Sequence, residues 1–362
     1  MSHKDPRETE LSVPKQHKAA IVQKEGGEVK VIDVDTPQKL ERGQVLVKVL
    51  FSGICHTDLH AQIGDWPAHA TFPLCGGHEG AGVVVALGEG ADQFVKKGDR
   101  VGIKWLADSC LTCDFCRHGN EPNCQAAKMH GFTEHGSFQQ YAVSFARHVT
   151  PIPDGLSLEA AAPLLCAGVT VWKAVKTANL TPGQTVAIVG AGGGLGHLAV
   201  QYAKAAGLRV ISIDTGDDKQ LLTQQLGSDH FVDFATEKDL VAAVKAKTSD
   251  GLGPHAAIVA ASGAKAYEQA LDYIRPTGAL VPVGLPPNAA CKYDIFFGVF
   301  FTKRILPSYV GNRQDAIESL QFAADGKVKV IYKARGLTEL ASIYDDMHHG
   351  KIAGRIVVDN SK

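Results

Sequence analysis

One stretch of the chain, residues 184–310, limits the possible folds most, because short apolar runs alternate there with helical patterns. Six runs resemble buried strands: Thr185–Val189, Arg209–Asp214, His230–Phe234, Ala256–Ala261, Ala279–Leu285 and Arg304–Val310. Between the first two, apolar residues recur at the spacing of one helix face: Leu195, Leu198, Ala199, Tyr202, Ala203 and Ala206. This alternation predicts an α/β fold with a doubly wound parallel sheet.

The first of these strands leads into a glycine-rich segment, Gly190–Gly196, that opens the next helix. Glycines let backbone N–H groups approach a pyrophosphate, and the helix N-terminus favours its negative charge. The match to GxGxxG is imperfect in either register, although Gly193 and Gly196 fit. Asp214 ends the next strand about 20 residues on, where an acid binds the ribose 2′-hydroxyl of NAD. A helix N-cap or a turn acid is the alternative for this aspartate.

The first 150 residues have a different pattern, with short β-like runs between glycine-rich turns. These runs are Lys18–Val22, Val29–Val34, Val45–Phe51, Val83–Leu87 and Arg100–Lys104. Such a pattern predicts an irregular, barrel-like antiparallel domain.

The last fifty residues contain two helix-like stretches, Arg313–Asp325 and Leu337–His349, and a strand, Arg355–Asp359. We expect this tail to return to the first domain. The expected domains are therefore residues 1–164 with 309–362, and residues 165–308.

The composition and charge of the chain indicate which classes of partner and which cellular compartment to expect. The 362 residues are 45% hydrophobic, enough for two cores, and 37 Lys+Arg balance 38 Asp+Glu. The balance indicates no nucleic-acid partner, and no apolar stretch reaches the ~18 residues needed to span a membrane. The N-terminus is polar and includes acids, unlike a secretory or transit sequence. We expect a cytoplasmic protein.

Four of the eight cysteines fall within fifteen residues, in the pattern C-x2-C-x2-C-x7-C: Cys110, Cys113, Cys116 and Cys124. In a reducing compartment such a cluster indicates a metal site before it indicates disulfides. Four thiolates close a tetrahedral zinc site and leave no open position, so this zinc would be structural. Free buried thiols and an iron–sulfur cluster remain alternatives on spacing alone.

A second possible metal site is spread along the chain at Cys55, His78 and Cys166. Spacing alone makes a weak case for it. Cys166 taken alone fits a small buried apolar residue, and His78 a structural histidine.

Taken together, the motifs give a stronger indication of function than any of them does alone. Gly77-His78-Glu79-x2-Gly82-x5-Gly88 is similar to the signature of the zinc-dependent medium-chain dehydrogenase/reductase family, and Cys55–Asp58 and the four-cysteine segment stand in the expected order. The resemblance runs from about Lys18 to the C-terminus. Four segments resemble the tetrameric, yeast-type alcohol dehydrogenases in particular: Gly64–Pro67, Gly136–Tyr141, Leu165–Gly168 and Ser308–Arg313.

The resemblance implies a GroES-like catalytic domain beside a Rossmann domain, and it implies roles for single residues. Cys55, His78 and Cys166 would be catalytic zinc ligands, with Glu79 as a carboxylate that can replace one of them. Asp58 would orient His78. Thr57 would take the alcohol proton, and His60 would end the proton relay, reached through the cofactor ribose.

It also implies cofactor and substrate contacts. The NAD-binding set, with Asp214, would be His56, Gly193, Gly194, Leu195, Gly196, Lys219, Phe234, Val283, Leu285, Ser308, Val310 and Arg355. Trp66 and Trp105 would wall the substrate channel.

The expected protein is an alcohol dehydrogenase with two Zn²⁺ per chain, one catalytic and one structural. It would transfer hydride reversibly between a small primary alcohol and NAD, giving an aldehyde and NADH, and it would form a homotetramer. The alternative within this class is a zinc dehydrogenase for polyols or bulkier aromatic alcohols. A zinc-free quinone reductase would not need the cysteines and His78, and a non-catalytic zinc-binding protein would not need an intact cofactor loop.

Overall fold

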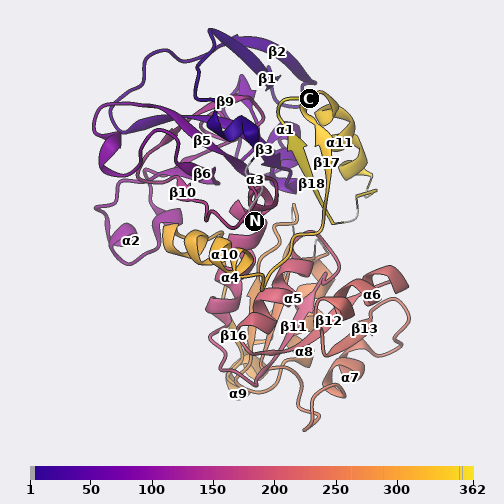
Figure 1. Ribbon diagram of the computed structural model, residues 1–362. Helices are drawn as coiled ribbons and strands as arrows, with labels where there is room; N and C mark the ends of the chain where they lie inside the picture. The colour runs from indigo at the N-terminus through magenta and orange to yellow at the C-terminus, as the bar shows by residue number, and fades with distance from the viewer. Residues whose placement is uncertain (1–4, 262, 288, 350, 353) are drawn as a thin grey trace. The chain divides into compact units, whose positions relative to one another are not determined.

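The computed structural model describes residues 5–362 except 262, 288, 350 and 353 (Figure 1). The chain divides into two compact units. Unit 1 comprises Met1–Cys166, Gly311–Asp325 and Val330–Lys362, and unit 2 comprises Ala167–Val310 and Gly326–Lys329.

Unit 2 contains, within the described residues, a six-stranded parallel sheet of order β13-β12-β11-β14-β15-β16. Its strands are β11 (Thr185–Val189), β12 (Arg209–Asp214), β13 (His230–Asp233), β14 (Ala256–Val259), β15 (Ala279–Pro282) and β16 (Arg304–Ile305). Its helices are α4 (Ala167–Ala178), α5 (Gly196–Ala205), α6 (Asp217–Gln225), α7 (Leu240–Lys245), α8 (Ala264–Tyr273) and α9 (Ile295–Phe300). The predicted doubly wound parallel sheet is confirmed.

Helices cover both faces of this sheet, and this explains the continuous apolar runs. All five residues of β11 are buried. Ala187 and Val189 pack into one cluster with Tyr267 and Ala270 of α8. Because alternate side chains of a strand point to opposite faces, the intervening residues of β11 are buried on the other side of the sheet.

The predicted strand Arg304–Val310 was wrong in length and burial, since β16 covers only Arg304 and Ile305 and both side chains are exposed. This strand lies at the edge of the sheet. Pro307 follows it and has no N–H to donate to a ladder. Beyond it, Ser308 N donates to Pro282 O at 3.1 Å, so the chain still follows the sheet without forming a strand.

Unit 1 is mostly β. Within the described residues, its largest sheet has the order β10-β6-β5-β3-β18-β17, with β9 also paired to β3. Smaller sheets are β2-β1-β4 and β7-β8. The strands are β1 (Gln16–Val22), β2 (Val29–Asp35), β3 (Gln44–Gly53), β4 (Leu74–Cys75), β5 (Gly80–Leu87), β6 (Arg100–Ile103), β7 (Leu106–Asp108), β8 (Lys128–Met129), β9 (Tyr141–Phe145), β10 (Thr150–Pro151), β17 (Tyr332–Gly336) and β18 (Arg355–Asp359).

The pairings in these sheets are antiparallel except for β17 with β18, and register shifts interrupt β3 against β5. The C-terminal tail returns to unit 1, because β18 pairs with β3 (Figure 1). The α-helices of the unit are α1 (His56–Ile63), α2 (Asp114–Arg117), α3 (Leu158–Ala161), α10 (Arg313–Ala324) and α11 (Leu340–His348). Its 3₁₀ helices are η1 (Pro6–Thr9), η2 (Ala91–Gln93), η3 (Glu121–Asn123), η4 (Ala162–Leu165) and η5 (Leu337–Glu339).

The described helices are short compared with a bilayer span, which takes about 20 apolar residues. None of them alone is long and apolar enough to cross a membrane. One bent pair, Leu158–Leu165 with Ala167–Ala178, reaches that threshold by length and composition only.

Candidate active site

A buried cluster in unit 1 brings together Cys55, His78, Glu79 and Cys166, whose potential ligand atoms all lie within 4.8 Å of one another. Cys55 caps the N-terminus of α1, and His78 and Glu79 lead into β5. Cys166 follows η4. Tertiary structure thus unites three segments that are far apart in the sequence.

Glycines make room for this cluster. Gly77 adopts φ +93°, and a Cβ there would lie 2.7 Å from Ser137 Oγ. At Gly53 a Cβ would lie 1.9 Å from Glu79 Oε2. Neither position accepts a side chain without displacing the buried groups beside it.

Asp58 orients the histidine of the cluster. Its Oδ1 is 2.8 Å from His78 Nδ1 and also accepts from Gly77 N, while its Oδ2 accepts from Cys55 N at 2.9 Å. His78 Nε2 is buried and has no hydrogen-bond partner among the described residues. A buried imidazole held at Nδ1 with a free Nε2, beside two thiols, is the donor set of a catalytic zinc site. These residues therefore fit a zinc ion.

The charges within the cluster are coupled. The hydrogen bond from Cys166 lowers the pKa of the Cys55 thiol well below its ordinary value, and His78 adds to this effect. The same bond and burial raise the pKa of Cys166. Burial alone would lower the pKa of His78, but Asp58 and Cys55 outweigh it and the pKa is raised. The pKa values of the two cysteines are therefore shifted in opposite directions by their contact with each other.

Glu79 is bound by Arg355 of β18 in a fully buried ion pair. Burial raises the pKa of Glu79 to about 7, against the opposing charge of the arginine. Arg355 was predicted to lie near a pyrophosphate, and the structure shows that its guanidinium contacts this carboxylate. Sequence reasoning missed this pair, because 276 residues separate its members.

The other predicted reaction residues lie on α1 and nearby. Thr57 Oγ1 accepts a hydrogen bond from Cys55 Sγ at 3.6 Å, so the hydroxyl adjoins the cluster. His56 is exposed at the first turn of the helix. His60, in the last turn, lies 2.8 Å from Asp65 and stacks on Trp66.

The two predicted channel tryptophans differ in their surroundings. Trp105 is buried, with its ring edge-on to His78 at 5.2 Å between centroids, and it also contacts Phe132. Trp66 is half-buried against His60. Trp105 therefore lies directly beside the cluster, whereas Trp66 lies beside the predicted relay histidine.

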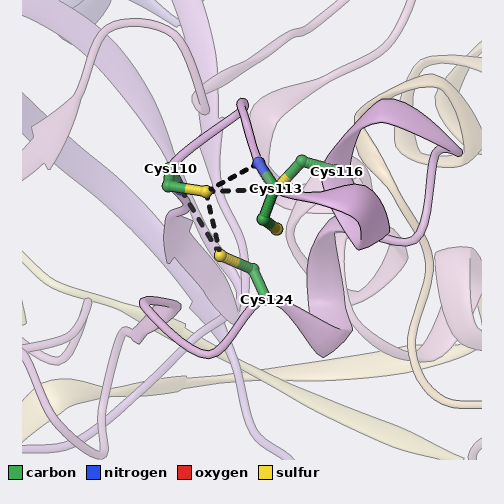
Figure 2. A group of neighbouring side chains, drawn as sticks. All are labelled: Cys110, Cys113, Cys116 and Cys124. Atoms are coloured by element: carbon green, nitrogen blue, oxygen red, sulfur yellow. Dashed lines mark hydrogen bonds between the residues drawn. The ribbon is translucent and has the colours of Figure 1, made fainter.

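The four-cysteine segment forms a separate cluster, in which Figure 2 shows Cys110, Cys113, Cys116 and Cys124 around a common centre. Cys110 Sγ lies 3.6 Å from Cys124 Sγ and 3.9 Å from Cys116 Sγ. All eight cysteines of the chain are free thiols. Four convergent, unbonded sulfurs are the donor set of a closed zinc site.

Backbone groups already favour thiolate in this segment. Hydrogen bonds from Thr112 lower the pKa of Cys110 to about 5, and Cys113 N also donates to its sulfur, at 3.3 Å. Leu111 adopts φ +59° in the tight turn that presents these N–H groups. Burial instead raises the pKa of Cys116 to about 12. Within this segment, hydrogen bonds therefore favour the thiolate at Cys110, and burial favours the thiol at Cys116.

The glycine-rich loop of unit 2 joins β11 to α5 as predicted. Gly193 N donates to Gly190 O at 3.0 Å. A Cβ at Gly196 would lie 2.0 Å from that same oxygen, so only glycine lets α5 begin so close to the strand. Gly194 and Leu195 complete the turn, with Leu195 at the N-cap of α5.

Asp214 ends β12 beside this loop. Its Oδ2 accepts from Gly192 N at 2.8 Å, and its Oδ1 accepts from Lys219 Nζ at 2.8 Å. The side chain is buried, and Gly216 rather than Asp214 is the N-cap of α6. The structure thereby excludes the helix-cap alternative for this aspartate.

The remaining predicted cofactor residues follow strand ends of unit 2. Phe234 follows β13, is exposed, and donates its N–H to Asp214 O at 3.1 Å. Val283 is buried just after β15, and Leu285 is exposed. Ser308 is buried, and Val310 adopts φ +40°. Carboxyl ends of parallel strands are the usual binding edge of such sheets.

Comparisons with known proteins agree with this geometry. Residues 41–154 match the family described as "Alcohol dehydrogenase GroES-like domain", and residues 194–325 match "Zinc-binding dehydrogenase". Alcohol dehydrogenase 1 of Neurospora crassa is 52% identical over 98% of this chain and 99% of its own length. The alcohol dehydrogenase of Schizosaccharomyces pombe is 46% identical over 97% and 100%.

Solved structures show the same fold. The alcohol dehydrogenase of Aeropyrum pernix matches with a TM-score of 0.85 and 31% identity, over 94% of this chain and 99% of that one. Acetophenone reductase of Geotrichum candidum, solved in complex with NAD, matches with a TM-score of 0.84 and 27% identity, over 96% and 98%. The chain therefore belongs to the zinc-dependent medium-chain dehydrogenase/reductase family.

Proposed function

We propose that this protein is a zinc-dependent, NAD-linked alcohol dehydrogenase that interconverts small primary alcohols and aldehydes. The observation that carries the proposal is the buried cluster, where two thiols and the free Nε2 of His78 converge beside Asp58. The near full-length similarity of this chain to fungal alcohol dehydrogenases supports the same activity.

In this proposal Cys55, His78 and Cys166 hold the catalytic zinc, and Glu79 stands behind it. Zinc in a three-ligand site supplies Lewis acidity that lowers the pKa of a hydroxyl at the open position. Asp58 keeps His78 in one tautomer and orientation, because it binds Nδ1. The four-cysteine cluster would hold a second, structural zinc.

The proton path is assigned to residues of α1. Thr57, whose hydroxyl already adjoins Cys55, would accept the alcohol proton. His60 would hold that proton at the partly exposed end of the helix before water takes it. The burial of the cluster excludes bulk water from the reacting groups, so a defined exit for the proton is needed.

Unit 2 would bind the cofactor, and NAD would supply the hydride acceptor. Gly193, Gly194, Leu195 and Gly196 would offer backbone N–H groups to the pyrophosphate, and His56 would lie near it. Asp214 would bind the adenosine ribose beside Lys219 and Phe234. Val283, Leu285, Ser308 and Val310 would lie along the nicotinamide.

We further propose a cytoplasmic homotetramer. Helix α9 exposes a run of large apolar side chains: Ile295 (69%), Phe296 (69%), Phe297 (54%), Val299 (72%) and Phe300 (69%). Beside it, β16 has one neighbour among the described strands and an open edge. A second copy of this chain would cover both, because two β16 edges can pair while the α9 helices pack. This pairing gives a dimer, and two such dimers would form the tetramer that the resemblance to yeast-type alcohol dehydrogenases implies.

The test is the initial rate of NADH formation with ethanol, propanol, butanol, cyclohexanol and benzyl alcohol. We expect kcat/KM to fall along this series, since pocket size discriminates by about 1–3 kcal/mol per methylene. Trp66→Ala should raise activity on the bulky alcohols relative to ethanol. A wild-type preference for cyclohexanol or benzyl alcohol would favour the polyol or bulky-alcohol alternative, and no NAD-linked oxidation of any alcohol would refute the proposal.

A further inference from the structure

His60 is held from two sides by residues that follow its helix. Its Nδ1 lies 2.8 Å from Asp65 Oδ1. Its ring stacks on the indole of Trp66, with centroids 5.0 Å apart and planes 20° apart. The hydrogen bond sets the direction of one ring nitrogen, and the stacking sets the ring plane. Together they leave the imidazole a single orientation.

A tight turn brings these partners back to the helix. Gly64 adopts φ +79° and ends α1, and its N–H donates to His60 O at 2.8 Å. A Cβ at this position would lie 2.2 Å from the carboxyl carbon of Glu25, so the turn requires glycine. The left-handed glycine therefore reverses the chain within one residue and places Asp65 against the last helical turn.

The pair has a defined chemistry. A carboxylate that accepts from Nδ1–H fixes the tautomer, so that the lone pair remains on Nε2. The same carboxylate stabilises the imidazolium that forms when Nε2 takes a proton. The side chains of His60 and Asp65 are 18% and 36% exposed, so a proton held there can pass to water.

We propose that Asp65 is the positioning residue of the proton relay, which keeps Nε2 of His60 ready to receive the proton leaving the reaction site. This inference rests on the proposed alcohol dehydrogenase function. Other ionisable groups near this region are His56, one turn earlier on α1, and the pair of Glu25 with His69 beside Gly64. On α11, Tyr344 lies near Asp58 instead.

The kinetic test compares Asp65→Asn, Asp65→Ala, His60→Gln and the double variant Asp65→Ala/His60→Gln. We expect Asp65→Ala to lower kcat at neutral pH by about tenfold, less than the ~10²-fold of a lost acid–base group, with KM for ethanol little changed. Alkaline buffer should restore the rate, since hydroxide then removes the proton directly. Asp65→Asn keeps an acceptor oxygen but no charge, so its kcat at neutral pH should lie between those of the wild type and Asp65→Ala.

The double variant decides whether Asp65 acts through His60. If it does, the double variant is no slower than His60→Gln alone. If the double variant instead loses kcat by the product of the two single-variant losses, the two residues act independently and the inference is overturned. The matched control is Glu25→Gln, which removes the charge from the exposed pair of Glu25 with His69 near Gly64 and should leave the pH profile unchanged.

A spectroscopic measurement does not depend on activity. With ¹⁵N-labelled histidine, the wild-type His60 resonance, assigned by its loss in His60→Gln, should show the Nδ1–H tautomer, and Asp65→Ala should shift it toward a mixture. An unchanged tautomer in Asp65→Ala would refute the positioning role. A wild-type enzyme without alcohol oxidation would refute the proposed function instead, which the rate of the wild type shows before any variant is compared.

Discussion

Lys104 is a buried lysine outside the proposed reaction path, and it lowers the stability of the fold near neutral pH. Its side chain is 3% exposed, and Nζ donates to the backbone oxygen of His148. Burial lowers its pKa to about 7, with Glu121 opposing and Arg313 adding to the shift. The unfolded lysine has a pKa of about 10.4. Between these two values the unfolded state binds more protons, so stability rises with pH.

We therefore predict that Lys104→Met raises the melting temperature at pH 7, because a neutral side chain avoids burying a charge. The gain should shrink as the pH rises from 7 toward about 10.4, because the wild-type lysine is neutral in both states only above that unfolded-state pKa. Calorimetry of both proteins across this range measures the difference. Exposed Lys97→Met is the control and should show no gain. An equal gain at pH 7 and pH 10 would contradict the assigned cause.

Asp214 is a single residue that we expect to set the choice of cofactor. Its carboxylate contacts both Gly192 N and Lys219 Nζ. We predict that the wild type prefers NAD to NADP, because a 2′-phosphate would lie against a buried carboxylate. Asp214→Ala should reduce the preference for NAD over NADP, mainly because it weakens NAD binding. Dissociation constants for NADH and NADPH from fluorescence titration measure this, with exposed Asp217→Asn as the control. Equal use of both cofactors by the wild type would show that Asp214 has another role.

At the scale of elements, the four-cysteine segment has little regular structure of its own. Between β7 and β8 it forms only the four-residue α2 and the three-residue η3. A metal bound by four thiolates would therefore replace a hydrophobic core for this loop. The residues of the catalytic cluster, in contrast, adjoin α1, β5 and η4 and are all buried, so we expect this part of the unit to fold without a metal.

We predict two zinc ions per chain with separable roles. Cys166→Ala should abolish activity and leave a folded protein with about one zinc. Cys113→Ala should lower the melting temperature, because the loop loses its cross-link. Elemental analysis and calorimetry measure both effects, and Cys291→Ser, at an exposed thiol outside both clusters, is the control. A single zinc in the wild type would exclude the two-site assignment.

For the whole molecule, the exposed helix α9 predicts assembly. Phe296→Asp combined with Phe300→Asp should reduce the assembly to a smaller species, since charges would oppose burial of this surface. Light scattering reports the mass as a multiple of 38.4 kDa. Phe94→Asp, at an exposed phenylalanine of unit 1, should leave the mass unchanged. A monomeric wild type would rule out the tetramer.

Most elements of unit 2 could be predicted from local pattern, and β11 and β12 have their predicted bounds. Strands buried on both faces give continuous apolar runs, which are easy to recognise. The predicted Ala279–Leu285 continues three residues beyond β15, and Arg304–Val310 was mostly not strand. An apolar run cannot distinguish a paired strand from the extended chain that leaves the edge of the sheet.

By itself, the sequence determined the two kinds of domain, the cysteine loop and the cofactor loop, because each depends on residues close together in the chain. Spacing alone did not predict the buried cluster, which only the family resemblance implied. Its geometry depends on the tertiary structure, since Cys55, His78 and Cys166 come from separate segments. Only the tertiary structure decided the pairing of Glu79 with Arg355. Asp65 is close to His60 in the sequence, but the contact between their side chains depends on a left-handed turn at Gly64. Local spacing encodes helices, strands and loops, whereas contacts between distant residues exist only after the chain has packed.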